Sequence, residues 1–253
     1  HVGPAYDHRT QQACCGSGAT LRTELVLEID EVPAEVQEAR RWEWLRGATH
    51  VALAVLREWF DVRHVLMFGS GNRGPHMWLL DEAVLQQTTE TRTDWMSRLE
   101  QPWNETGWST LRKKWLLPFA KEFYIDRHSG SGDRSGYSEA SLEAMFPQRL
   151  AALCFPKFDR AVALQPSHLH RLPFSINEKS MRIALPFAHP DEMPRDTSDM
   201  PRVGEADCSA FWSALSTLQA VVDQLDARDA SDPLASVPAV RSAPWFAKFD
   251  SKR

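Results

Sequence analysis

The sequence predicts an α+β fold, and three observations support that prediction. Runs typical of strands come in pairs around turn residues, helical periodicity is confined to separate stretches, and the regular β-α-β alternation of a parallel sheet is missing. The composition suits a globular chain, because 43% of the 253 residues are hydrophobic and 25% are charged. We therefore expect mixed β-sheets flanked by helices.

The composition also excludes several classes of protein. No stretch approaches the roughly 20 consecutive apolar residues of a membrane span, and the first residues lack a signal-peptide pattern. The net charge of −5 argues against binding nucleic acid through an overall positive field, although a local basic groove remains open. We interpret the cysteines as reduced structural thiols of an intracellular protein, since none has C-x-x-C spacing: Cys14, Cys15, Cys154 and Cys208. Because the sequence starts at His1 without a methionine, we expect a truncated or processed chain.

The first expected element is a strand over residues 23–30. Its side chains alternate, so Leu27 and Ile29 share one face, whereas Glu28 and Asp30 point to the other. The pattern predicts one apolar and one acidic face.

A helix and a hairpin complete the first segment, residues 1–81. Apolar residues recur at helical spacing over 34–60, with Gly47 as a weak point. Two apolar runs, 64–68 and 75–80, flank a glycine-rich turn and predict a β-hairpin.

The second segment, residues 82–152, is expected to be an inserted helical subdomain. It has helical spacing over 82–125, a loop composition over 129–136 and a short helix over 138–152. Its tryptophans favour a helical core over a partner surface, because they recur at helical spacing: Trp95, Trp103, Trp108 and Trp115.

The third segment, residues 153–253, returns to strands. The run 154–164 is interpreted as a strand, and 171–176 with 182–187 as a second hairpin. An amphipathic helix is expected over 207–227.

Glu28 and Asp30 are the first candidates for chemistry. Carboxylates at i and i+2 on a strand stand about 7 Å apart at the backbone, close enough to share hard cations. By itself this pattern is a weak signal, because a solvated strand face is the commoner explanation of such a pair.

The turn at 69–74 satisfies the pattern G-x-G-x-x-G. A dinucleotide-binding turn must open a helix, but a strand is expected to follow, which argues against a Rossmann site. A hairpin loop that presents Ser70, Arg73 and His76 suits phosphate binding through side chains and amides, and a merely tight turn is the alternative.

A third group lies further along the chain. Asp159 offers another carboxylate, and His168 and Arg171 offer cationic donors, although a structural histidine is the commoner case. The H-x-H pair lacks partners at zinc spacing, so zinc is disfavoured. Together, three carboxylates and several cationic side chains are what a two-metal nucleotidyltransferase needs.

Four motifs in this order resemble the catalytic small subunit of archaeo-eukaryotic DNA primase, with greater similarity to the eukaryotic branch. Stretches near both ends also resemble family positions, so the resemblance covers nearly the whole chain. The motifs are ELVLEID (24–30), SGNRGPHMW (70–78), FPKFD (155–159) and HLHRLPFSINEKSMRI (168–183), and the end stretches are AYDHR (5–9) and APWFAKF (243–249).

The resemblance implies an enzyme that makes short RNA primers on single-stranded DNA from ribonucleoside triphosphates in DNA replication. It implies a two-metal Mg²⁺ or Mn²⁺ site, a primase large subunit and a DNA polymerase alpha complex as partners, and a location in the nucleus. It assigns metal binding to Glu28, Asp30 and Asp159, and nucleotide binding to Ser70, Arg73, His76, His168, Arg171 and Arg9.

Some positions depart from the family pattern. Glu28 stands where Asp is usual, Asn72 replaces an arginine, Asn177 often has histidine as its counterpart, and Arg171 stands where lysine is common. Residues 31–63 contain no cysteine, so the family's zinc knuckle is missing and we predict no zinc. Two alternatives therefore stay open: a catalytically degenerate subunit with a structural role, and a primase-polymerase that uses deoxynucleotides.

Overall fold

The computed structural model describes residues 24–125, 137–165, 170–204 and 209–231, and it has the predicted α+β architecture. At its centre is a four-stranded antiparallel sheet in the order β1-β3-β2-β6, and β4 pairs with β5 in a separate ribbon. The strands are β1 (Leu25–Glu28), β2 (Val65–Gly69), β3 (Pro75–Leu79), β4 (Ile176–Asn177), β5 (Arg182–Ile183) and β6 (Pro186–Phe187).

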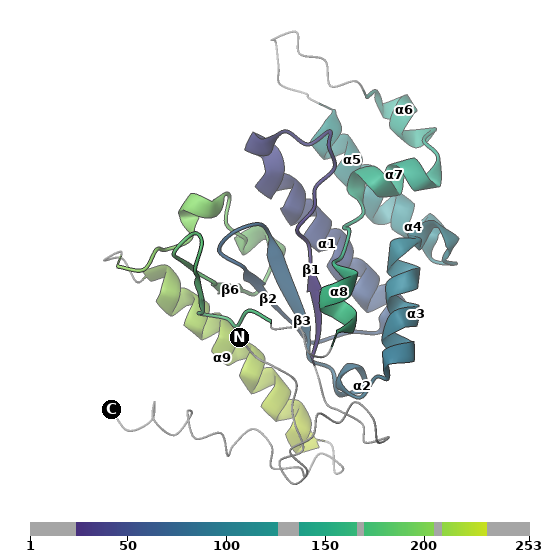
Figure 1. Cartoon of the computed structure of the whole chain (residues 1–253). Coiled ribbons are helices and arrows are strands. Elements are labelled where there is room, and N and C mark those ends of the chain that lie inside the picture. Colours follow the sequence, from purple (N-terminus) through teal and green to yellow (C-terminus); the bar gives the residue numbers. More distant parts are fainter. Residues whose placement is uncertain (1–23, 126–136, 166–169, 205–208, 232–253) are drawn as a thin grey trace, which may run out of the picture.

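Helices cover both faces of the sheet, with α9 on one side and α1 and the other large helices on the opposite side (Figure 1). The α-helices are α1 (Arg41–Phe60), α2 (Glu82–Leu85), α3 (Thr89–Glu100), α4 (Trp108–Leu111), α5 (Leu117–Tyr124), α6 (Glu139–Glu143), α7 (Pro147–Cys154), α8 (Arg160–Leu164) and α9 (Ser209–Ser231). The shorter turns are η1 (Glu38–Arg40), η2 (Pro102–Asn104), the π-helical η3 (Arg112–Leu116), η4 (Pro190–Glu192) and η5 (Thr197–Asp199).

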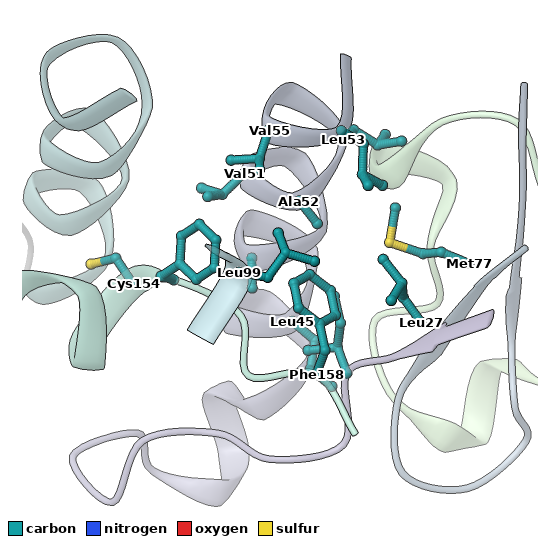
Figure 2. Close-up of a cluster of buried hydrophobic side chains, with 14 of the residues drawn as sticks. Leu27, Leu45, Val51, Ala52, Leu53, Val55, Met77, Leu99, Cys154 and Phe158 are labelled. Carbon is teal, nitrogen blue, oxygen red and sulfur yellow. The ribbon is translucent and has the colours of Figure 1, made fainter. Parts of the chain in front are cut away.

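Strand alternation divides the buried side chains between two cores. On one face, Leu27 and Met77 point toward Leu45 and Leu53 of α1 (Figure 2). On the other face, a smaller cluster joins the sheet to α8 and α9: Val26, Leu66, Phe68, Trp78, Val162 and Ala184, with the partly buried Leu218 and Val221. The sheet is therefore buried on both faces around its hairpin.

The helices α2 to α7 share the larger core with α1 and the sheet. Trp108 is buried, and Trp95, Trp103 and Trp115 pack against the core, which confirms that these tryptophans fill a helical interior. The π-turn η3 ends just before Pro118, whose ring clashes with a regular helical carbonyl four residues earlier, so the wider turn accommodates it.

The predicted strand over 154–164 is wrong. Cys154 ends α7, and Arg160–Leu164 form helix α8, whose N-cap is Asp159. The Asp159 side chain accepts hydrogen bonds from the amides of Ala161 and Val162. A short apolar run fits a strand or a helix equally well, and here the cap decides for the helix.

The second predicted hairpin also pairs differently. Only 176–177 and 182–183 form its ladder, whereas residues 186–187 leave it and pair with β2. The predicted helix over 34–60 begins at Arg41, after the short turn η1. Its Gly47 lies where the Phe119 ring packs on α1, and a Cβ atom there would clash with that ring.

Among the described residues, no helix has the length and apolar character needed to cross a membrane. Cys154 is a free, buried thiol, and burial raises its pKa, in keeping with the predicted structural role. The other three cysteines lie outside the described residues.

Candidate active site

The register between β1 and β3 places the acidic strand against the hairpin turn. Glu28 pairs with His76 across the two strands, and the amide of Ile29 donates to the carbonyl oxygen of Pro75, 3.2 Å away. Gly74 must be glycine at this approach, because a Cβ atom would clash with the main-chain oxygen of Ile29. Asp30 thus lies beside the turn that begins after Gly69.

The turn itself is fixed by hydrogen bonds from the β4-β5 ribbon. Its ends close through the amide of Ser70, which donates to the carbonyl of Gly74 at 3.1 Å. The Asn177 side chain donates to the oxygen of Ser70 at 3.2 Å, and the Ser180 hydroxyl donates to that of Gly71 at 2.6 Å. Gly71 has a φ of 79°, a conformation that glycine adopts without strain. Two segments about 107 residues apart are therefore held as one unit.

Glu28 and Asp30 are poorly hydrated carboxylates. Their side chains are only 13% and 15% exposed. Burial, together with the negative charges of Asp30 and Asp159, raises the pKa of Glu28 to about 7. Burial also raises the pKa of Asp30, although Arg73, whose Nη2 lies 2.8 Å from Asp30 Oδ2, opposes that shift. The interpretation of this pair as a solvated strand face is wrong.

His76 is a neutral side chain in this site. Its Nδ1 lies 3.2 Å from Glu28 Oε1, but the contact is too poorly aligned to be a hydrogen bond, and among the described residues this nitrogen has no hydrogen-bond partner. Burial lowers the pKa of His76 to about 3, helped by the nearby charge of Arg171. His76 therefore offers a neutral imidazole, and not a cation, to a ligand.

Asp159 lies close to the pair but outside the cavity lining. Its amide donates to the carbonyl of Glu28 at 3.3 Å, and an isolated bridge between Glu31 and Lys157 holds the two segments together. Its Oδ1 accepts both cap hydrogen bonds of α8, so its other oxygen takes no part in the cap. The structure thus brings the third predicted carboxylate beside the first.

The acidic pair and two of the predicted cationic residues, Arg73 and Arg171, meet in one cavity of about 190 Å³. Three acidic residues face three basic ones there, so the formal charges balance. Arg171 lines the cavity, and its Nη1 donates to the main-chain oxygen of Ile176 at 2.9 Å. The lining residues are Glu28, Asp30, Ser70, Asn72, Arg73, His76, Arg171, Asn177, Glu178 and Lys179.

Of the predicted site residues, Arg9 and His168 lie outside the described part of the chain. The sequence analysis missed Glu178 and Lys179, which follow Asn177 in the resembling motif, and it also missed Arg41. Arg41 donates through Nη2 to the main-chain oxygens of Asp30, at 2.6 Å, and Arg73, at 3.0 Å. Arg41, which belongs to α1, therefore positions the loops that carry Asp30 and Arg73. No sequence pattern predicts this contact.

The comparison with protein families agrees with this geometry. A family model described as DNA primase small subunit matches residues 30–188. The match contains the turn with Ser70, Arg73 and His76, and it also contains Asp159 and Arg171. Since it spans more than half of the chain, the protein belongs to the DNA primase small subunit family.

Proposed function

We propose that this chain catalyses DNA-templated synthesis of short RNA primers from ribonucleoside triphosphates by two-metal nucleotidyl transfer. The observation that supports the proposal is the cavity in which Glu28 and Asp30 face Arg73, Arg171 and Lys179. Carboxylates bind divalent cations, and guanidinium and ammonium groups bind phosphates. One cavity therefore contains groups for the metal ions and groups for the triphosphate.

The carboxylates fit divalent metal ions. Two poorly hydrated carboxyl groups with raised pKa values gain from a nearby positive charge, and their oxygen atoms suit Mg²⁺ or Mn²⁺. Glu28, Asp30 and Asp159 would hold these ions. When bound, the ions would supply a positive charge that favours deprotonation of the primer 3′-hydroxyl and that would stabilise the charge on the α-phosphate and the leaving pyrophosphate.

The chain's own cations would bind the triphosphate. Arg73 is 67% exposed although it pairs with Asp30, so its guanidinium can turn to a phosphate once Asp30 has another partner. Arg171 and Lys179 also line the cavity, on the segment that Asn177 ties to the turn. Fixing the triphosphate at these side chains would orient the α-phosphate for in-line attack.

His76 would act as a positioning residue. As a neutral imidazole beside Glu28, it has no charge that competes with a cation for the carboxylate. Its buried ring also packs against Phe68 of β2, with 5.2 Å between ring centroids, which fixes its orientation. We expect it to hold Glu28 and a phosphate oxygen at fixed places.

The family implies a large-subunit partner and a DNA template. We propose in addition that this chain works with a DNA polymerase alpha complex on single-stranded DNA in the nucleus, and that it uses ribonucleotides. The assignment rests on the resemblance of its motifs to the eukaryotic branch.

A catalytically degenerate subunit is the second candidate. Asn72 lines the cavity where the resemblance leads us to expect an arginine, and Glu28 replaces an expected Asp. The cavity has lost one phosphate-binding charge, but three cations remain in its lining. A third candidate, a primase-polymerase, differs only in the sugar that it accepts.

The decisive experiment is primer synthesis on single-stranded DNA with Mg²⁺ or Mn²⁺ and labelled ribonucleotides, with and without the large subunit. Wild type is compared with Asp30→Asn, which keeps the shape and removes the charge, and with Asp61→Asn, a control in an exposed ion pair. Products from wild type and the control, but not from Asp30→Asn, support the proposal. Absence of products with retained nucleotide binding points to the degenerate subunit, and preferred incorporation of deoxynucleotides points to the primase-polymerase.

A further inference from the structure

A second group of metal-binding side chain types lies where α1 meets η4. His50 of α1 and the residues on either side of Pro190, His189 and Asp191, each bring one ligand atom within 4.8 Å of the others. His50 Nε2 lies 2.9 Å from Asp191 Oδ1, and His189 Nδ1 lies 3.1 Å from Asp191 Oδ2. None of the three lines the candidate active-site cavity.

We propose that His50, His189 and Asp191 bind one zinc ion, with water as the fourth ligand. Two imidazole nitrogens and one carboxylate oxygen are a donor set that favours zinc and related transition metals over Mg²⁺, which prefers oxygen ligands throughout. The sequence analysis predicted no zinc because the cysteine cluster is missing and the H-x-H pair at 168–170 lacks partners at zinc spacing. The site proposed here uses neither group and differs from that prediction.

The distances between the ligand atoms fit a tetrahedral ion. Zinc–ligand bonds of about 2.0–2.1 Å place neighbouring ligand atoms roughly 3.3 Å apart. Asp191 meets each imidazole near this distance through a different oxygen, Oδ1 toward His50 and Oδ2 toward His189, so its exposed carboxylate turns slightly when one oxygen binds the ion. The two rings meet edge to face with centroids 5.1 Å apart, and their ligand nitrogens lie within 4.8 Å of each other, so zinc binding requires the exposed His189 ring to turn toward His50.

The contact between His189 Nδ1 and Asp191 Oδ2 requires a proton or a metal ion between the two atoms. The amide of Asp191 donates to His189 Nδ1 at 3.4 Å, so this nitrogen presents a lone pair toward residue 191. Asp191 Oδ2, another acceptor, lies 3.1 Å from the same nitrogen. Two acceptors at this distance repel each other unless a proton or a metal ion lies between them.

The backbone that carries these ligands is well fixed. Pro190 is buried, and the amides of Glu192 and Met193 close the turn on the oxygens of His189, at 2.9 Å, and Pro190, at 3.0 Å. Arg46, one turn before His50 on α1, donates to the oxygen of Met193 at 3.2 Å. Its positive charge lowers the affinity for a cation, but its hydrogen bond holds η4 against α1, so the ligands are preorganised.

A zinc ion here would link α1 to η4 and to the segment that follows η4. Pro194 and Met200, which follow η4, pack against Gly69 at the end of β2. The expected result of binding is therefore higher stability. This inference does not depend on the catalytic proposal, because neither its residues nor its readout involve the cavity.

The test is titration of the metal-free full chain with ZnCl₂, followed by calorimetry and thermal unfolding. We expect one zinc ion per chain, a raised Tm, and no such effect from the same concentration of Mg²⁺. In His50→Asn and His189→Asn we expect affinity to fall by more than about 100-fold, because even supporting residues of metal sites contribute about 10- to 100-fold. Asp61→Asn, an exposed aspartate in an ion pair with Arg63, is the matched control and keeps wild-type affinity.

Cobalt separates this site from binding by the cysteines. Co²⁺ at two imidazoles and a carboxylate gives visible ligand-field bands without the intense near-ultraviolet band of a thiolate ligand. A thiolate band, no zinc binding, or equal affinity in wild type and both histidine variants would overturn the proposal. Since His189 is 57% exposed, its variant is expected to fold even if His50→Asn does not.

Discussion

Arg73 Nη2 lies 2.8 Å from Asp30 Oδ2, so a candidate phosphate-binding group and a candidate metal ligand form one ion pair. This pair satisfies both groups before any substrate is present. Arg73 is largely exposed and can be hydrated without its partner, whereas Asp30 is mostly buried and needs another cation when Arg73 leaves it. Asp30 can therefore exchange Arg73 for a metal ion, and Arg73 can exchange Asp30 for a phosphate group.

Arg73→Gln should weaken nucleotide binding. A hydrogen bond to a charged group contributes about 1.5–3 kcal/mol, so we expect the KM for ATP in primer synthesis to rise by roughly 10- to 100-fold. Arg63→Gln is the control, because Arg63 is an exposed arginine paired with Asp61. An unchanged KM in Arg73→Gln would remove Arg73 from the nucleotide site.

Glu28→Gln should stabilise the metal-free protein at alkaline pH. The folded state raises the pKa of Glu28 from 4.5 to about 7, so between these values the folded chain binds more protons than the unfolded chain. The contribution of Glu28 to the free energy of unfolding therefore falls as the pH rises through this window, by at most about 3 kcal/mol. Glu28→Gln lacks this loss and should be more stable than wild type at pH 8, while primer synthesis disappears.

Urea unfolding at several pH values without divalent metal measures this effect. Glu122→Gln is a suitable control, because Glu122 is exposed on α5 and its substitution should leave the pH dependence of wild type unchanged. A Glu28→Gln protein with the same pH profile as wild type would contradict the assigned burial of this carboxylate.

Asn177→Ala should loosen the phosphate-binding turn. The side chain donates to Ser70, and its Oδ1 accepts from the amides of Lys179, at 3.1 Å, and Ser180, at 3.2 Å. Leaving such buried groups unpaired costs about 1–3 kcal/mol of stability, and we expect a higher KM for ATP as well. Asn104→Ala, at an exposed asparagine bonded to Gln101, should change neither quantity. Denaturant unfolding and steady-state kinetics check both.

Gly74→Ala should disrupt the site more than another glycine substitution. The new Cβ atom meets the main-chain oxygen of Ile29, so β1 must move away from the turn and carry Asp30 with it. Gly204→Ala is the comparison, because its Cβ atom meets open space and only the φ of 89° is strained, at about 1–2 kcal/mol. We expect Gly74→Ala to lose more stability than this and to lose primer synthesis. Equal effects in the two variants would contradict the close approach of β1 to the turn.

Local patterns account for the parts of the fold that the sequence predicts well. Period-two alternation marked β1, and two apolar runs around glycines marked the β2-β3 hairpin, so Glu28, Asp30 and Arg73 were found as candidates. Asp159 was found as a further carboxylate, and the resemblance assigned it to metal binding. The strand predicted around it was wrong, because a four-residue apolar run does not distinguish a strand from a helix. The N-cap that favours the helix consists of the Asp159 side chain, which accepts from the amides of Ala161 and Val162.

Contacts between distant segments could not be predicted in this way. Arg41 looks like one more arginine on a helix, and only folding brings it to the oxygens of Asp30 and Arg73. His50 and Asp191 are 141 residues apart, so no spacing rule connects them. Periodicity shows which side of an element is buried, but not which other element lies against it.

The pairing of β6 with β2 has a consequence for how the protein forms during translation. β2 pairs with β3 on one side, but on its other side Met67 and Phe68 pair with Phe187 and Pro186, so this edge of the central sheet stays open until residue 187 has left the ribosome. The hydrogen bond from Asn177 to Ser70 in the turn likewise forms only after the segment around residue 177 has been synthesised. A nascent chain that ends before this point already contains Glu28, Asp30 and Arg73, yet it exposes an unpaired β2 edge where a chaperone, or another nascent chain, can bind.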